Sequence, residues 1–263
     1  RVPSEATVSR LSRKVERIVD PSVLHERVVQ AYTKSLDRLA IGHLSIDSTT
    51  IGAREKPIKT RAPEAKANEK RGRKAKGSLE EQQYRERQAR LEQERIAYLQ
   101  ESFEESLARL EMRCSLTAKQ NSKGKKQWFI GYKAHLATDD YGVPVSFAVT
   151  GASVHDSKVA VPLMKKARKI TDFLYVLLDK GYISPVINDY VDMIGRKAII
   201  DRRASYKGVV ADPLDPASQR RYAARTTVER TNSELKDGFL PDTIYKRGAH
   251  ARYEIALAIL LTT

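Results

Sequence analysis

Apolar side chains recur at helical spacing at the start of the chain. Pro3 and Ser4 form a helix start. The apolar positions that follow, every three or four residues, are Val8, Leu11, Val15 and Ile18. A second helix is predicted over 22–37, with Val28, Tyr32 and Leu36 facing inward. This helical lead-in, residues 1–40, is compatible with a helix-turn-helix DNA reader, but plain helix packing is the commoner case.

Five later segments have the β-branched or continuously apolar character of strands. They are 43–51, 128–138, 144–151, 173–179 and 197–201. The turn "DDYG" at 139–142 joins the second and third of these into a β-hairpin. The run "FLYVLLD" at 173–179 is apolar throughout until its closing acid, which is typical of a buried central strand.

Helices are predicted between and after these strands, over 155–170, over 183–194 and around the stretch "TTVERTNSELKD" at 226–237. Strands that alternate with helices in this order predict a mixed α/β sheet with helices on both faces. We assign residues 41–53 and 127–263 to this domain.

The segment between its two parts, residues 54–126, has a different composition. Residues 54–76 contain ten Lys or Arg against three Glu and almost no large apolar side chain, which predicts a basic mobile loop. From Ser78 to about Met112 the chain lacks Gly and Pro, and Ser78 with Glu81 fits a capping box. We therefore predict a long helix, solvated or paired with another chain over its first half.

Composition narrows the choice of function. The formal net charge is +15 at pH 7 and the pI is about 9.8, an excess that commonly indicates a nucleic-acid partner. The single cysteine, Cys114, excludes an intrachain disulfide and favours a reducing compartment. The five histidines are scattered, so no zinc site is expected. The longest apolar run, 255–261, is too short to span a bilayer, and no signal segment opens the chain. Because the chain begins without Met and stops within an apolar helical pattern, we expect it to be part of a longer protein.

Two acids stand at the ends of predicted strands, Asp47 in "SIDST" and Asp179 in "LLDKG". A carboxylate at the end of a buried strand is costly unless a partner compensates it. Either acid alone is explained by a turn or a helix cap. Together with a third acid on a helix, they fit Mg²⁺, which prefers oxygen ligands and can assist phosphodiester displacement.

The helix at 226–237 offers that third acid. At about 100° per residue, four side chains of this region fall within about 60° of one another. They are Tyr222, Arg225, Glu229 and Lys236. Glu229 lies at the edge of the packing face, whereas Glu234 points toward solvent. The row could hold phosphates of a DNA strand, or it could be a salt-bridged helix face with an Arg225–Glu229 pair.

The spacing of this row resembles the Tyr-Arg-Glu-Lys signature of bacterial insertion-sequence DDE transposases. "IDST", "GYKAHLATDDYGVP", "VHDSK" and "LLDKGY" are similar to the other segments of that family, in its order, over most of 43–261. The resemblance implies an RNase H-like fold and a metal-binding triad of Asp47, Asp179 and Glu229, loaded with Mg²⁺ or in its place Mn²⁺. It also implies DNA partners, transposon ends and target, a homodimer in the active complex, and a cytoplasmic, nucleoid-associated location.

One departure concerns the insertion. Relatives with a large insertion often carry it between the second Asp and the Glu, whereas here the long segment follows Asp47. Its role therefore cannot be transferred from the family.

Further basic residues are candidates for DNA contacts. Lys133 and His135 lie two apart and share one face of a strand, where they could line the DNA path, although a hydrogen-bonded sheet histidine is equally expected. Lys180 follows a candidate metal ligand, and Arg230 follows Glu229. Asp156 could cap the helix at 155–170 or take part in the chemistry.

Together with the composition, this family resemblance leads us to expect a DNA transposase that cleaves transposon ends and transfers the strand to target DNA. The alternatives are an inactive DNA-binding protein on a nuclease fold and a related metal-dependent nuclease that cuts without strand transfer.

Overall fold

A computed structural model describes residues 3–36, 40–59, 75–120, 124–201 and 213–263, and every structural statement below concerns these residues. The strands are β1 (Ala40–Ala53), β2 (Ser115–Gln120), β3 (Lys126–Thr138), β4 (Pro144–Gly151), β5 (Asp172–Leu178), β6 (Lys197–Ile200) and β7 (Thr243–Ile244). The helices are α1 (Glu5–Ile18), α2 (Pro21–Ser35), α3 (Leu79–Gln100), α4 (Phe103–Ala108), α5 (Ser157–Arg168), α6 (Pro185–Met193), α7 (Pro216–Tyr222), α8 (Thr226–Glu234) and α9 (Ala249–Leu261). Short 3-10 turns lie at η1 (Lys180–Tyr182) and η2 (Ala223–Arg225), and a π-helical turn lies at η3 (Leu235–Phe239).

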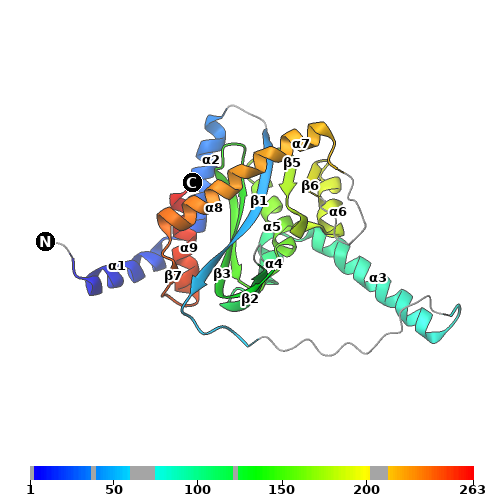
Figure 1. Cartoon of the computed structure of the whole chain (residues 1–263), viewed down its shortest axis with the longest axis horizontal. Helices are drawn as coiled ribbons and strands as arrows, with labels where there is room; N and C mark the ends of the chain where they lie inside the picture. Colours follow the sequence, from blue (N-terminus) through cyan, green and yellow to red (C-terminus); the bar gives the residue numbers. More distant parts are fainter. Residues whose placement is uncertain (1–2, 37–39, 60–74, 121–123, 202–212) are drawn as a thin grey trace.

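The described strands form one mixed sheet in the order β2-β3-β1-β5-β6, with β4 also paired to β3 and β7 to β1. β3 runs antiparallel to β1, β2 and β4, whereas β5 is parallel to both β1 and β6. Helices cover both faces of the sheet (Figure 1). The predicted mixed α/β sheet is confirmed, and its arrangement is consistent with an RNase H-like fold.

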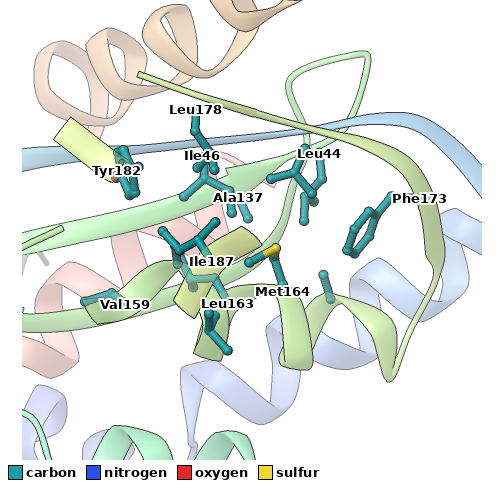
Figure 2. Packing of buried hydrophobic residues seen from close by; sticks show 14 of the residues in the cluster. Leu44, Ile46, Ala137, Val159, Leu163, Met164, Phe173, Leu178, Tyr182 and Ile187 are labelled. Carbon is teal, nitrogen blue, oxygen red and sulfur yellow. The ribbon is translucent and has the colours of Figure 1, made fainter. Parts of the chain in front are cut away.

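Alternating side chains of β1 supply two hydrophobic clusters, one on each face of the sheet. Leu44 and Ile46 face α5 and α6, where they pack with Met164 and Ile187 (Figure 2). Ile51 belongs to the opposite cluster, which packs against α8 and α9. A strand buried on both faces is a rigid support for a polar group that lies between these clusters.

Most predicted elements of the domain are present. β3 and β4 form the predicted hairpin, and β5 lies between β1 and β6 as a central strand. α5 and α6 fall within the predicted ranges 155–170 and 183–194. These segments share a continuous or regularly spaced apolar pattern, which is the signal that local sequence carries best.

The helical lead-in differs from the prediction in its packing. Ser4 caps α1 as expected, but the apolar side chains of this helix are exposed. Their exposed fractions are 53% for Val8, 52% for Leu11, 46% for Val15 and 81% for Ile18. In α2 the buried side chains are His25 and Val29, together with Pro21, whereas Val28 is exposed. The prediction that Val28 faces inward was therefore wrong by one helical position.

The segment between β1 and β3 also differs. The predicted long helix is two helices, because the chain is extended at Glu101 and Ser102 and α4 starts anew there. Ser78 caps α3 as predicted, since its hydroxyl accepts from the Glu81 amide, but the Glu81 carboxylate accepts from the Gly77 amide instead of that of Ser78. A complete capping box belongs to Ser102 with Glu105. Figure 1 shows α3 projecting away from the sheet, and none of its residues is buried.

The predicted basic loop is only partly described. Residues 60–74 lie outside the described residues, but 54–59 are anchored to the domain. Glu55 accepts hydrogen bonds from Tyr132 at 2.5 Å and from the Gly248 amide at 2.9 Å. β2 was not predicted, and it extends the sheet at the edge of β3. The division of the chain into lead-in, domain and insertion stays a prediction.

Candidate active site

Asp47 and Asp179 lie at the same level on neighbouring parallel strands. The register pairs Ser45 of β1 with Leu177 of β5, so each acid lies two residues beyond this pair. Adjacent strands are about 4.8 Å apart, which places the two backbones side by side here. Asp47 was predicted to end its strand, and this was wrong. It lies in the middle of β1, since β1 continues to Ala53 along β3.

Asp179 also serves as a local cap. Its Oδ1 accepts a hydrogen bond of 2.7 Å from the amide of Gly181, which opens η1. A Cβ at position 181 would lie 2.9 Å from that oxygen, so the glycine of "DKGY" leaves room for the carboxylate. The turn-cap explanation for Asp179 is therefore realised, but it engages only one carboxylate oxygen directly.

The turn η2 and the helix α8 bring polar side chains against Asp47. The Arg225 guanidinium donates to Asp47 Oδ1 at 3.0 Å and to Glu229 Oε1 at 2.5 Å. Asn232, one α-helical turn beyond Glu229, donates to Asp47 Oδ2 at 2.9 Å. Asp47 is half-buried, Arg225 is largely buried, and Glu229 keeps 54% of its side chain exposed. The predicted Arg225–Glu229 pair thus exists, and Arg225 joins it to the sheet.

Asp47 lies within electrostatic range of the other two predicted acids, Asp179 and Glu229. Burial raises the pKa of Asp47 above its ordinary value; Arg225 counteracts this, while Asp179 and Glu229 add to it. Burial opposes the charge of Arg225, but the anionic groups around it, Asp47 foremost, raise its pKa. Asp47 therefore has two acidic neighbours whose repulsion favours a cation at this place.

The donor set fits a magnesium ion in its chemistry, since three carboxylates supply the oxygen ligands that Mg²⁺ prefers. In their present positions, the described His, Cys, Asp and Glu side chains form no group of three that could hold a metal ion. Arg225 instead forms ion pairs with two of these acids, Asp47 and Glu229.

The predicted row along the helix is interrupted by changes of helix type. η2 separates α7 from α8, and the π-helical turn η3 follows α8. Residues three apart eclipse in a 3-10 turn, which brings Tyr222 close to the Arg225 guanidinium and raises the pKa of that group further. Lys236 lies in η3 and is exposed, as Glu234 is at the end of α8. The solvent position predicted for Glu234 is confirmed.

Lys236 has a basic neighbour that the sequence did not indicate. Partial burial, followed by the charges of Lys133 and Lys236, lowers the pKa of Lys119 on β2, while Asp156 and Asp47 oppose that shift. Lys119 therefore lies within electrostatic range of both Lys133 and Lys236. Lys180 and Arg230, both predicted DNA contacts, are also exposed.

Lys133 and His135 share a strand face as predicted, but both are buried. His135 Nε2 lies 2.9 Å from Thr150 Oγ1, and burial lowers the pKa of its ring to about 3. Lys133 Nζ donates to Val154 O and to Asp156 Oδ1, each at 2.9 Å. Contact of these two side chains with DNA is not supported, because they are buried and hydrogen-bonded within the domain.

Asp156 has a structural partner instead of a capping role. It stands at the N-terminus of α5 without a side-chain cap. Burial alone would raise the pKa of Asp156, but the ion pair with Lys133 holds it below its ordinary value. This pair ties the start of α5 to β3 on the opposite face of the sheet from α8.

The main residue that the sequence prediction missed is Asn232. It is buried, and it lies within about 20° of Arg225 at about 100° per residue, so the helical row could have included it. Tyr182 is fully buried near Asp47 and Asp179, and its hydroxyl has no hydrogen-bond partner among the described residues. No pattern signalled Lys119, since the strand that carries it was not predicted.

A mixed sheet flanked by helices, with three acids gathered beside exposed basic side chains, is consistent with enzymes that cut and join nucleic-acid strands. The sequence model of the family described as "Transposase DDE domain" matches residues 39–263, most of the chain, and the protein belongs to this family. It is therefore a DNA transposase. A search among curated proteins and a search among solved structures gave no match. Among the described residues, no helix is long and apolar enough to cross a membrane.

Proposed function

We propose that the protein cleaves DNA at transposon ends and transfers the freed strand to target DNA, with Asp47, Asp179 and Glu229 as its metal-binding residues. The observation that carries this proposal is the meeting of the three acids: two on neighbouring strands by register, and one on the helix packed against them. When bound, divalent cations such as Mg²⁺ or Mn²⁺ would activate the attacking oxygen and stabilise the leaving oxygen of a phosphodiester.

The other side chains of the site would prepare the carboxylates and hold the DNA. Asn232 fixes the orientation of the Asp47 carboxylate through the hydrogen bond to Oδ2. Exposed Lys236 and Lys180 would contact DNA phosphates, with Arg230 as a further candidate. Tyr222 and Arg225, with Glu229 and Lys236, would form the Tyr-Arg-Glu-Lys signature at the transposon end. The active complex would be a homodimer that holds two ends.

A nicking assay on supercoiled or labelled duplex DNA in Mg²⁺ or Mn²⁺ tests the triad. Asp179→Asn and Glu229→Gln should abolish nicking, because each removes the charge of a metal ligand. Glu234→Gln is the matched control: it removes an acid from the same helix, but from an exposed position. Retained nicking by both Asp179→Asn and Glu229→Gln would contradict the assignment.

The same assay separates the alternatives. DNA binding by the protein without any nicking would favour an inactive DNA-binding protein. Nicking without joining of the 3′ end to a second duplex would favour a nuclease that lacks strand transfer. Joining that depends on Asp179 would support the full reaction.

A further inference from the structure

The carboxylate of Asp47 is engaged at both oxygens by donors from the same chain. Arg225 binds Oδ1 at 3.0 Å, and Asn232 binds Oδ2 at 2.9 Å. Both donors come from one helical segment, and both are largely buried. A carboxylate in this state has little remaining capacity for a further strong cation on the side that Arg225 covers.

Arg225 does more than pair with one acid. Its two terminal nitrogens engage Asp47 and Glu229, residues on different elements, so one positive charge bridges two of the three predicted ligands. Its Nε is buried without a hydrogen-bond partner among the described residues, which leaves the guanidinium held chiefly by these two carboxylates. Glu229 is more than half exposed, and this part of the contact is open to solvent.

A guanidinium and a divalent cation on the same carboxylates compete for the same negative charge and repel each other, so each weakens the binding of the other. A displaced guanidinium needs another anion. Arginine suits a DNA phosphate, whose oxygens it can bind bidentately. The exposed Lys236 lies further along the same helical segment and offers a second basic side chain for a DNA phosphate.

We propose that Arg225 is an internal counter-ion, which a divalent cation displaces from Asp47 and Glu229 and which then binds a DNA phosphate. This inference rests on the proposed metal-binding role of the three acids. The two binding events are therefore coupled. Metal binding releases Arg225 to bind a DNA phosphate, and DNA binding removes Arg225 from the carboxylates that the metal uses. Thermodynamic linkage requires the two effects to be equal in size.

The first test measures Mn²⁺ affinity without DNA, by calorimetry or by the electron paramagnetic resonance of free Mn²⁺. Arg225→Gln should bind Mn²⁺ roughly five-fold or more tightly than the parent, in the range of ordinary coupling between sites. Arg220→Gln makes the same charge change at an exposed position of the same helical segment and should bind as the parent does. Arg225→Lys keeps the positive charge but not the guanidinium that bridges two carboxylates, so its Mn²⁺ affinity should lie between those of the parent and Arg225→Gln. This variant preserves the test if Arg225→Gln folds poorly.

The second test measures the affinity for a labelled duplex by fluorescence anisotropy, with and without Ca²⁺ as an oxygen-seeking probe. Ca²⁺ should tighten DNA binding by the parent several-fold and should have no such effect on Arg225→Gln. The counter-ion role would be overturned if Arg225→Gln and Arg220→Gln bound Mn²⁺ with equal affinity. It would also be overturned if Ca²⁺ tightened DNA binding by Arg225→Gln as much as it does for the parent.

These outcomes are distinguishable from a failure of the proposed triad. If only the counter-ion role fails, Asp179→Asn still loses nicking and Mn²⁺ binding while Arg225→Gln shows no gain in affinity. If the triad itself is wrong, Asp179→Asn binds Mn²⁺ as the parent does, and both proposals fall together.

Discussion

Replacement of Lys133 by Met separates a structural role of this lysine from a role in DNA binding. Lys133 is 8% exposed, and its ammonium donates to Asp156 and to a backbone carbonyl. Met keeps the length and removes the charge. The substitution therefore leaves the carboxylate of Asp156 without its main partner on the inner face of α5.

The size of the effect follows from burial. Removing one partner of a buried ion pair costs about 3–5 kcal/mol, but Asp156 keeps 31% of its side chain exposed and is partly solvated. We therefore expect the free energy of unfolding to fall by about 2–3 kcal/mol. The double variant Lys133→Met with Asp156→Asn should lose less than Lys133→Met alone, because no unpaired charge remains.

Urea unfolding followed by circular dichroism gives the stability, and DNA affinity as a function of salt gives the number of phosphate contacts. Lys180→Met is the matched control, since Lys180 is exposed. It should leave stability nearly unchanged and reduce the salt slope by about one unit. The structural role of Lys133 is refuted if Lys133→Met has the same free energy of unfolding as the parent and also lowers the slope of log DNA affinity against log salt by about one unit.

Three other changes test separate parts of the structure. Lys236→Ala should weaken DNA binding and lower the slope of log affinity against log salt by about one unit; an unchanged slope removes it from the DNA contacts. Gly131→Ala should destabilise the protein by more than about 2 kcal/mol in urea unfolding, because the new Cβ would lie 2.0 Å from the Ile51 carbonyl oxygen at a φ of +155°. Gly238→Ala is the control and should be tolerated, because the space around Gly238 is open. Equal losses of unfolding free energy for the two variants would argue against the close pairing of β1 with β3 at Gly131. Burial lowers the pKa of His25 to about 4, so the unfolded chain takes up this proton first and stability should fall as pH drops from about 6.5 to about 4. His25→Gln should flatten the stability profile in that window, and an unaltered profile would exclude His25 as its source.

The sheet was predictable where one strand carries its own signal. The run at 173–179 is continuously apolar up to its closing acid, and no pairing information is needed to recognise it as a strand. The end of β5, Val176 to Leu178, is buried, whereas Leu174 is 50% exposed. The hairpin of β3 and β4 is likewise local, since a short turn fixes its pairing. Local sequence does not reveal β2, which has one large apolar residue, Leu116, and owes its strand conformation to hydrogen bonds with β3.

Helical periodicity predicted which faces are apolar, but not what covers them. In α2 the stripe predicted through Val28 lies one position from the residues that pack, His25 and Val29. The shift arises because a buried histidine, which bonds the Pro144 carbonyl at 2.8 Å, occupies a place that a hydropathy pattern assigns to solvent. α1 shows the same limit, since its apolar spacing forms a helix whose apolar side is exposed.

For the candidate site, the motif spacing predicted the three acids and Arg225, but not Asn232, the second donor to Asp47. A fixed angle per residue placed Arg225 and Glu229 together correctly, and it would have included Asn232. It could not show that Lys133 turns away to the opposite face of the sheet, because that depends on the register of β3 against β1.

The same architecture indicates which parts of the site can move. Asp47 is held in a strand paired on both sides, and Asp179 is fixed by its cap on η1. Glu229 projects from a helix with more than half of its side chain in solvent, and Arg225 is anchored mainly by the carboxylates themselves. Under the proposed metal-binding role, rotation of these two side chains would open Asp47 Oδ1 to a divalent cation. The strands need not shift, and this is why a substitution at Arg225 should alter metal affinity without altering the sheet.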